Sequence, residues 1–308
     1  VNSVDITVYC ESERLMFEAD QELSERCPNK NYKIKIVDMQ LFELQSGKPD
    51  ILFYNMPVKS IRSGEENLKE AVIKNVLETR CLINFAHSNK IPLVFILSGS
   101  GALNARNWIG ATQRLGELFA QFADSQSKKT FTKFRVIRIP ASISDPSIVF
   151  GKIISSIFVN GCVNCSCENS EKGAVYYRKD ILPLLIKAVT FLMKSNDITS
   201  GVYTIVPKNS LTFDSFVESM CETVCLKPHR DVQILKNNNP KEMELDDFID
   251  INEPLEKTAV AGILRTKFFC TNADNYNNIW TKEEISAMTT RELISAVFQN
   301  LNEKIKIL

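Results

Sequence analysis

An apolar run, a turn of small residues and a helix-like stretch follow one another over residues 91–123, and this segment constrains the fold more than any other. Residues 91–97 have the composition of a buried strand, residues 98–101 form a Ser-Gly-Ser-Gly turn, and residues 107–123 are expected to be helical. Open α/β sheets present their chemistry in this way, at the carboxyl ends of their strands. The segment therefore predicts an α/β protein with a site after this strand.

Strand-like and helix-like segments alternate through the first half of the chain. The expected strands are residues 4–9, 32–37, 50–54, 93–97 and 134–139, and the expected helices are residues 13–26, 66–88 and 107–123. Alternation of this kind predicts βαβ units and a doubly wound parallel sheet. We therefore expect a Rossmann-like domain over residues 1–140.

The alternation is weaker after Pro140. The expected elements there are helices at 147–158, 181–194 and 210–225, a strand at 201–206, a loop at 236–240 and one or two helices within 281–307. These segments predict a smaller, mostly helical C-terminal region over residues 141–308.

Charge, hydropathy and cysteine usage exclude several classes of protein. Lys and Arg together number 37, as do Asp and Glu, so no excess charge attracts nucleic acid or an anionic membrane. No apolar run approaches the roughly 20 residues needed to span a bilayer, and Val1 opens no secretory leader. Nine cysteines, an odd number in a large chain, predict reduced thiols in the cytoplasm rather than a disulfide framework.

Three segments resemble, in the same order, one family of sugar-nucleotide enzymes. Residues 50–60 read Asp-Ile-Leu-Phe-Tyr-Asn-Met-Pro-Val-Lys-Ser, residues 70–76 read Glu-Ala-Val-Ile-Lys-Asn-Val, and residues 104–114 keep two asparagines, a Gly-Ala-Thr and an arginine of a catalytic helix. On these motifs the chain resembles the capsule-type UDP-N-acetylhexosamine 4,6-dehydratases and C5-epimerases of polysaccharide biosynthesis, which are extended short-chain dehydrogenases. With residues 201–206, which fit a late strand of the family, the resemblance covers most of the chain.

The resemblance implies that residues 4–9 are the second strand of the family's sheet. The family's first strand and its glycine-rich turn, which holds the cofactor pyrophosphate at a helix N-terminus, would then lie upstream of residue 1. No Gly-x-Gly-x-x-Gly sequence occurs in this chain. A longer chain or a partner then supplies this strand. The alternative is that residues 4–10 have become the first strand, followed by a turn at residues 10–12 that binds no phosphate.

The resemblance also implies positions for cofactor binding. Cys10 replaces an acidic residue that binds the adenosine ribose, Ser12 and Glu13 keep the two family residues after it, and Asp38 corresponds to an aspartate near the adenine. Each has a structural alternative, because serine suits a helix N-cap, glutamate a first helical turn and aspartate a turn after a strand. No cofactor is expected if the site is inactive, and NADP is expected if it is active.

The family's catalytic positions carry other residues here. Its Thr-Asp-Lys becomes Gly99, Ser100 and Gly101, its methionine or tyrosine becomes Ile109, and the lysine beside the nicotinamide becomes Gln113. Hydride removal from a sugar needs a base for the hydroxyl proton and a cation beside the nicotinamide. Isoleucine and glutamine supply neither group, so we predict an inactive site.

The positions that bind the substrate are only partly kept. Lys59, Asn75 and Tyr176 match the family and are the candidate remnants of a substrate site. Val175 and Asn239 stand where the family has arginines. Because the clamp for the substrate is lost together with the catalytic groups, we interpret the chain as a pseudoenzyme.

Cysteine and aromatic residues offer two further hypotheses. The residues that could hold zinc are Cys162, Cys165, Cys167, Cys221, Cys225 and His229. Because there is no second Cys-x-x-Cys pair, a surface hairpin of reduced thiols is the favoured interpretation, and we expect no metal. Cys221 and Cys225 are four residues apart, which predicts one buried face of a helix. Trp108 either plugs the former substrate pocket or packs in the core.

Three functions remain open at this stage. The leading hypothesis is a degenerate family member that acts by binding or assembly, because residues 66–88 and 107–123 match the helices through which family members pair with themselves or with a paralogue. The second is an active NADP-dependent dehydratase or epimerase of UDP-amino-sugars, and the third is a sugar-nucleotide sensor. An apolar surface over the two long helices, with a blocked pocket, favours the first.

Overall fold

The fold is described from a computed structural model. It describes residues 5–28, 31–37, 48–56, 65–103, 108–126, 131–140, 162–166, 176, 178–194, 201–208, 218, 221–222, 225–227, 230–231, 233–237, 255–266, 269–270 and 280–306. The predicted helix at 147–158, most of the one at 210–225, Asp38 and Lys59 lie outside these residues.

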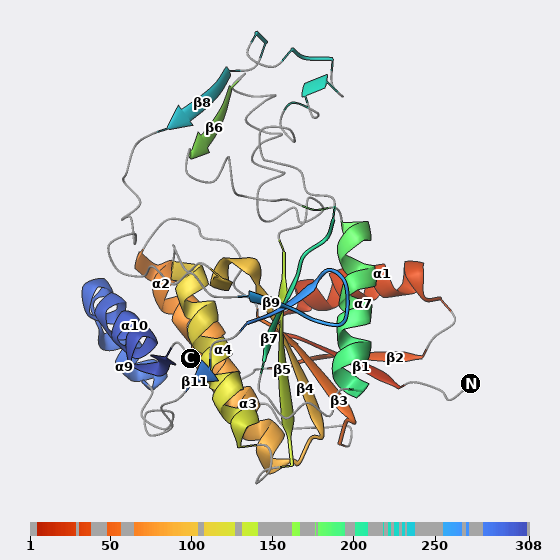
Figure 1. The fold of residues 1–308 in the computed structure, drawn as a ribbon, viewed down its shortest axis with the longest axis vertical. Coiled ribbons are helices and arrows are strands. Elements are labelled where there is room, and N and C mark those ends of the chain that lie inside the picture. The colour runs from red at the N-terminus through yellow and green to blue at the C-terminus, as the bar shows by residue number, and fades with distance from the viewer. Residues whose placement is uncertain are drawn as a thin grey trace.

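A six-stranded sheet forms the centre of the molecule (Figure 1). Its order is β3 (Ile51–Asn55), β4 (Leu93–Gly99), β5 (Lys133–Ile139), β7 (Val202–Ile205), β10 (Ile263–Thr266) and β9 (Leu255–Lys257). The first four strands are parallel, β10 pairs with β7 in the antiparallel direction, and β9 pairs antiparallel with β10. The predicted Rossmann-like α/β class is confirmed, and β9 and β10 are strands that the sequence patterns did not predict.

A second, two-stranded parallel sheet holds β1 (Ile6–Cys10) and β2 (Tyr32–Ile36), joined by helix α1 (Glu13–Arg26). Among the described strands, neither β1 nor β2 is a hydrogen-bonded neighbour of β3. The break falls between β1 and β3, where the resemblance places a further strand. Both interpretations of that first strand stay predictions.

One face of the main sheet is covered by a long helical segment and by α4 (Trp108–Ser125). The helix predicted at 66–88 is present as α2 (Glu65–Val72), a π-helical segment η1 (Ile73–Leu77) and α3 (Glu78–Ser88). Side chains from these helices and from the sheet form the larger core, which includes Val72, Leu115 and Phe119. The opposite face carries α7 (Arg178–Lys194), whose Ala188 and Leu192 pack on the sheet in a second core.

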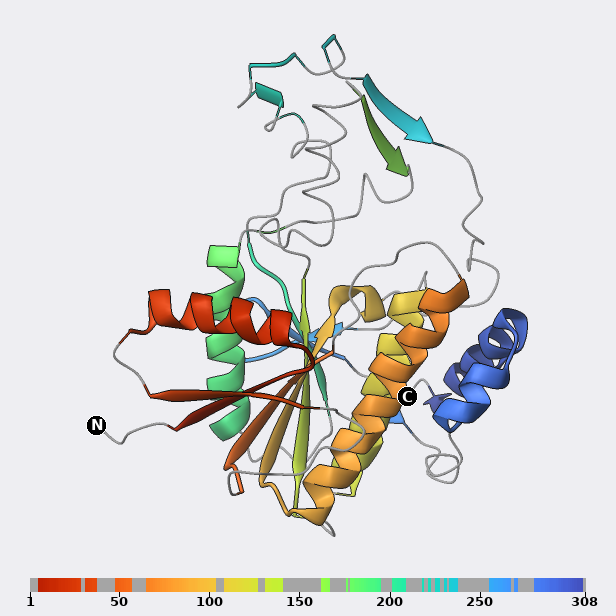
Figure 2. The same ribbon diagram turned by 180° about the vertical axis from the view of Figure 1, so that it is seen from behind.

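Two C-terminal helices, α9 (Lys282–Ala287) and α10 (Thr290–Lys304), confirm the helices predicted within residues 281–307. They lie beside α2 and α4 in both views of the ribbon (Figures 1 and 2). The strand β11 (Phe269–Cys270) precedes α9 in the chain and pairs antiparallel with β12 (Ile305–Lys306), which follows α10. The helices α9 and α10 therefore form a hairpin that belongs to the same helical layer as α2 and α4.

Two sequence predictions in the C-terminal half are wrong. Lys236 and Asn237, expected in a loop, belong to β8 (Gln233–Asn237), which pairs in parallel with β6 (Cys162–Ser166). Pairing with β6 satisfies the backbone of a segment whose asparagines suggest a turn. Cys221 and Cys225 do not share a buried face, because Cys221 is buried whereas Cys225 has a φ of 60° and is exposed. A left-handed residue ends a helix, so Cys225 lies in a turn.

Candidate functional site

The predicted site lies at the carboxyl end of β4. Gly99 is the last residue of β4, Ser100 and Gly101 begin a 3₁₀ turn (η2, Ser100–Leu103), and α4 carries Ile109 and Gln113 in its first turns. Strand, turn and helix therefore follow the order predicted from the sequence. The described side chains among these positions are brought to one end of the sheet, as expected for an open α/β fold.

The space beside Gly99 is filled by the side-chain amide of Gln113. A Cβ atom on residue 99 would lie 2.8 Å from Oε1 of Gln113 and 3.0 Å from its Nε2, so the glutamine side chain would have to shift to make room for it. Gln113 is 2% exposed, and Ile109 beside it is also buried. Glycine at position 99 and glutamine at position 113 are thus complementary. A neutral amide and an apolar side chain stand where the family needs a cation and a proton relay.

Asn75, a predicted remnant of a substrate site, joins two helices. Its Nδ2 donates to Oγ1 of Thr112 at 3.1 Å, and that hydroxyl donates to the Ile109 carbonyl at 3.1 Å. The Asn75 carbonyl accepts from Oγ1 of Thr79 at 2.8 Å. Asn75 is fully buried in the π-helical segment η1. Its described contacts tie η1 to the first turns of α4, which is a structural role.

The segment η1 and the helix α4 approach each other closely at Gly116. A Cβ atom there would lie 2.5 Å from the Asn75 carbonyl oxygen and 2.9 Å from Cε of Met56. Only glycine lets the two helices approach this closely without displacing backbone. The polar seam of Asn75, Thr79 and Thr112 therefore depends on a glycine one turn further along α4.

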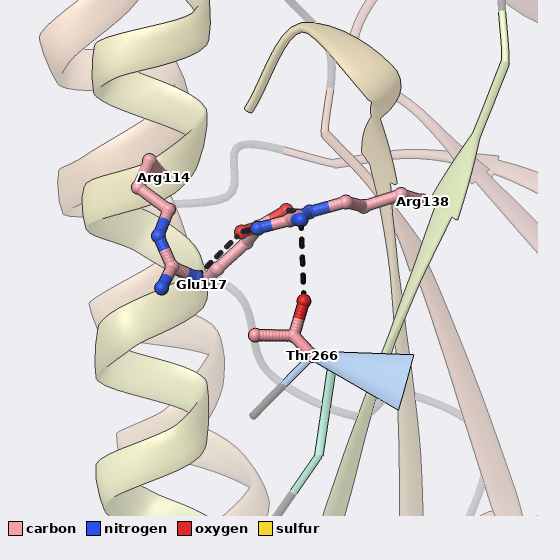
Figure 3. Close-up of polar contacts among 4 residues, drawn as sticks. All are labelled: Arg114, Glu117, Arg138 and Thr266. Carbon is pink, nitrogen blue, oxygen red and sulfur yellow. Dashed lines mark hydrogen bonds and ion pairs between the residues drawn. The ribbon is translucent and has the colours of Figure 1, made fainter. Parts of the chain in front are cut away.

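A buried ion cluster lies one turn beyond Gln113 (Figure 3). Glu117 accepts hydrogen bonds from Arg138 on β5 (Nε to Oε1, 2.9 Å, and Nη2 to Oε2, 2.6 Å) and forms an ion pair with Arg114 (Nη1 to Oε2, 3.1 Å). Nη1 of Arg138 also donates to Oγ1 of Thr266 on β10 at 3.5 Å. The three charged side chains are at most 1% exposed. Arg114, which matches the family's motif, is thus part of a link between α4 and the sheet.

The ionisation of Glu117 follows from these contacts. Burial favours the neutral acid, but the charge and hydrogen bonds of Arg138 and the charge of Arg114 outweigh it and lower the pKa of the carboxyl group. Glu117 is therefore an anion at neutral pH. The signal in the sequence that points to this cluster is an arginine, Arg138, within a largely apolar strand, where a charged side chain is buried only when it is paired.

The cofactor positions at the end of β1 have structural contacts. Ser12 caps α1, with its Oγ accepting from the Leu15 amide at 3.3 Å, and Glu13 lies exposed in the first turn of the helix. Cys10 is buried, and burial raises the pKa of its thiol. A neutral thiol cannot replace a carboxylate as an acceptor for ribose hydroxyls. The structural alternative for Ser12 is confirmed.

A charged contact missed by the sequence patterns bridges the break between the two sheets. Nζ of Lys74 in η1 lies 2.6 Å from Oε2 of Glu11, just after β1, and 2.9 Å from Oε1 of Glu78. Partial burial works to lower the pKa of Lys74, but hydrogen bonds to the two carboxylates outweigh it and raise the pKa. The Tyr54 hydroxyl on β3 donates to the Lys74 carbonyl at 3.2 Å. Lys74 therefore connects β1 to η1 and β3.

The remaining candidates lie apart from this site or outside the described residues. Tyr176 is buried in an isolated bridge, and burial raises the pKa of its hydroxyl. Cys162 and Cys165 lie in β6, whereas Cys167 and His229 are outside the described residues, so the zinc alternative stays a prediction. The described residues contain no group of three or more His, Cys, Asp or Glu side chains that could hold a metal.

Two surface cavities can be placed on the described elements. One of about 500 Å³ lies along the outer side of α10, and one of about 770 Å³ lies between the end of α1 and the start of β2. Neither is lined by the residues at the end of β4. No helix in the described part of the chain is both long enough and apolar enough to cross a bilayer.

The order of the strands and helices defines a Rossmann-like α/β fold. Residues 1–148 match the model of a family described as polysaccharide biosynthesis protein. Over 140 residues, 44% of this chain, the sequence is 29% identical to an uncharacterized membrane protein of Methanocaldococcus jannaschii. That match spans 41% of the relative's length.

Solved structures with a similar fold include three proteins. Pen from Bacillus thuringiensis has a TM-score of 0.61 at 17% identity, over 84% of this chain and 78% of that one. UDP-glucuronic acid 4-epimerase from Bacillus cereus in complex with NAD has a TM-score of 0.56 at 13% identity, over 79% and 84%. L-threonine 3-dehydrogenase from Trypanosoma brucei has a TM-score of 0.52 at 16% identity, over 76% and 84%. At these identities the comparisons show a shared Rossmann-like fold.

Proposed function

We propose that this chain is a catalytically degenerate relative of the capsule-type sugar-nucleotide dehydratases and epimerases, and that it acts through binding or assembly. One observation carries the proposal: the amide of Gln113 fills the space beside Gly99 at the carboxyl end of β4. The resemblance puts an acid–base group and the cation beside the nicotinamide at these two positions. Neither position carries the group that the resemblance puts there, and the Gln113 side chain occupies the space beside Gly99.

The chemistry of the family explains why this loss matters. Removal of a hydride from a sugar carbon leaves a developing carbonyl, and it needs a base for the hydroxyl proton and positive charge near the nicotinamide. Gln113 is neutral at every pH, and buried Ile109 has no proton to exchange. The nearby Arg114 does carry a charge, but Glu117 lies 3.1 Å from its guanidinium. These contacts support a structural role for α4.

Binding without turnover is the second candidate. Two observations support it. One of the structures with a similar fold is a complex with NAD, and Glu13, a predicted cofactor-binding residue, lies exposed after β1. A sugar-nucleotide sensor needs the binding groups and none of the catalytic ones. An active NADP-dependent enzyme would in addition need its cation and its base from residues other than Gln113 and Ile109.

Thermal unfolding with and without NADP, NAD and UDP-N-acetylglucosamine separates these functions. A ligand present at about one hundred times its dissociation constant adds about 2.7 kcal/mol to the stability of the folded state. We expect no shift of the midpoint at millimolar concentrations. A reproducible shift with any of the three would replace the leading proposal by a sensor or an enzyme, and a turnover assay would then distinguish these two.

The proposed partners and setting follow from the same resemblance. We propose that assembly with a second copy or with an active paralogue uses the helices at residues 66–88 and 107–123, in the cytoplasm, and that the pathway is polysaccharide biosynthesis. The match of residues 1–148 to a polysaccharide biosynthesis family supports the pathway. Neither nucleic acid nor a resident cofactor is part of the proposal.

A further inference from the structure

The elements β1, α1 and β2 form a βαβ unit that packs only weakly against the rest of the chain. We call this unit, residues 5–28 and 31–37, the arm. Its three elements make their closest contacts with one another. In both views of the ribbon the arm lies beyond the β3 edge of the main sheet (Figures 1 and 2). Of its described side chains only that of Cys10 is buried, and no residue of α1 is buried.

The arm buries little apolar surface. Four of its large apolar side chains are between 41% and 69% exposed, namely those of Ile6, Leu15, Phe17 and Ile36. In the main sheet, by contrast, Val94, Phe95 and Ile96 of β4 are completely buried. Burial of apolar surface is the largest favourable contribution to folding. It therefore stabilises the arm far less than it stabilises the main sheet.

Two described ion pairs link the arm to the rest of the chain. Oε2 of Glu11, just after β1, lies 2.6 Å from Nζ of Lys74 in η1, and the two side chains are 32% and 25% exposed. Oε1 of Glu22 on α1 lies 3.2 Å from Nη2 of Arg178 at the start of α7, and these side chains are 47% and 49% exposed. Ion pairs with such access to water are weak, and salt screens them.

Lys74 has a second carboxylate partner that does not belong to the arm. Its Nζ lies 2.9 Å from Oε1 of Glu78, four residues further along the same helical segment, and the Glu78 side chain is 3% exposed. This contact holds the lysine on the main part of the molecule whether or not Glu11 is present. Glu11 is therefore the group that the arm contributes to the link, and its removal leaves the Lys74–Glu78 pair in place.

The arm is too small to keep its structure when it is detached. A sheet of two strands with one helix is at best marginally stable in water, and chains below about 40 residues rarely fold alone. Detachment therefore unfolds the arm. The main sheet keeps its own two cores, to which no described residue of the arm contributes. Cooperative units of this kind open at a free energy below that of global unfolding.

We propose that the arm is a local unfolding unit, which opens while the main sheet stays folded, and that the ion pair of Glu11 with Lys74 controls this opening. Ser12 and Glu13, two predicted cofactor positions, belong to the arm and lose their fixed placement when it opens. A salt-sensitive contact thus controls these positions. The proposal concerns the packing of the arm and goes beyond the question of catalysis.

Thiol labelling and hydrogen exchange follow the opening in the full chain under native conditions. Alkylation of buried Cys10 by N-ethylmaleimide reports on the arm, and that of buried Cys221, outside the arm, serves as the internal control. Exchange of the β1 and β2 amides is compared with that of β4 and β5 by mass spectrometry. E11Q removes the charge of the link, and the matched control E18Q removes an exposed pair with Arg14 inside α1. Circular dichroism confirms that the variants are folded.

The amides of β1 and β2 should exchange as one group, well before those of β4 and β5, and Cys10 should react faster than Cys221. E11Q should speed the exchange of the arm and the labelling of Cys10 by about two- to fivefold, the effect expected for one partly exposed ion pair. E18Q should leave both rates unchanged. An increase of NaCl from about 0.05 M to about 0.5 M should bring the wild type close to E11Q and change E11Q less.

Two results would overturn the proposal. One is exchange of the β1 and β2 amides together with those of β4 and β5, at the rate of global unfolding. The other is a set of rates for E11Q that equals that of the wild type at low salt. Neither result depends on ligand binding or on turnover, so a failure of this inference is distinguishable from a failure of the proposed loss of catalysis.

Discussion

The buried carboxylate of Glu117 offers the sharpest prediction about stability. The substitution E117Q keeps the size of the side chain and removes its charge. Two arginine side chains, Arg114 and Arg138, then face a neutral amide inside a core from which water is excluded. Removal of one partner of a buried ion pair lowers the free energy of unfolding by about 3–5 kcal/mol, because the remaining charge stays out of water without full compensation.

The magnitude follows from the geometry of the cluster. Glu117 accepts two hydrogen bonds from Arg138, at 2.9 and 2.6 Å, in the bidentate arrangement that makes such contacts strong. An amide offers a single acceptor oxygen, so one of the two contacts is lost in any orientation. We expect E117Q to lower the free energy of unfolding by about 3–5 kcal/mol, with a fall in the unfolding midpoint of roughly 5–15 °C.

Urea and thermal unfolding measure this loss. The control is E18Q, which removes the exposed partner of Arg14, and which should change the free energy by less than about 0.5 kcal/mol. The reasoning is refuted if E117Q unfolds within 1 kcal/mol of the wild type with an unchanged dependence on urea. In that case the cluster does not link α4 to the sheet.

The pH dependence of the stability provides a second test of the role of Glu117. The pKa of Glu117 is lowered in the folded state below its usual 4.5, and the unfolded chain has no such contacts. Its contribution to stability is therefore fully present above pH 4.5 and declines as the pH falls toward the lowered value. The difference in stability between the wild type and E117Q should be constant from pH 7 to pH 5 and should shrink in more acidic solution.

Three further predictions concern packing and caps. G116A should destabilise the protein by about 1–3 kcal/mol in urea unfolding, since its Cβ would meet the Asn75 carbonyl at 2.5 Å, and a change within 0.3 kcal/mol would contradict the close approach. G99A should be destabilising alone but less so in combination with Q113A, and strictly additive effects in a double-mutant cycle would show that the two positions do not touch. T281A should lower stability by about 0.5–2 kcal/mol through the loss of the α9 cap, and a neutral effect would argue against the capping box.

Local signals account for the elements that the sequence predicts well. The bounds of α1 follow from Ser12, which caps the helix, and the predicted bounds agree with the observed Glu13–Arg26. The strand β4 begins as a continuous apolar run, as expected for a strand buried on both faces, and β5 is apolar apart from Lys133 and its two buried arginines. Each of these signals lies within a few residues of the element it specifies.

The parts that the sequence does not predict depend on contacts between distant residues. The pair of Glu117 and Arg138 is separated by 21 positions, and Arg138 meets Thr266 across 128 positions. The complementarity of Gly99 and Gln113 exists only because the turn after β4 brings α4 back over the end of the strand. The packing of α9 and α10 against α2 and α4 likewise depends on contacts between distant residues, which periodicity cannot indicate.

The resemblance predicted the fold correctly, but it gave a partial account of individual residues. Asn75 was expected to be a remnant of substrate binding, and its described hydrogen bonds join η1 to α4. Arg114 was one of the residues that matched the motif, and it contributes to a buried ion cluster. Residues that match a catalytic helix therefore also serve the packing of that helix, and they can be kept without the chemistry.

A turnover assay tests the central claim most directly. The purified chain is incubated with UDP-N-acetylglucosamine and NADP or NAD, and the sugar nucleotide is followed by mass spectrometry for loss of water and by NMR for inversion at the sugar carbons. The account predicts that the substrate is recovered unchanged after prolonged incubation at high protein concentration. A product that forms in proportion to the amount of protein, and that is absent when the protein has been denatured by heat, would contradict it.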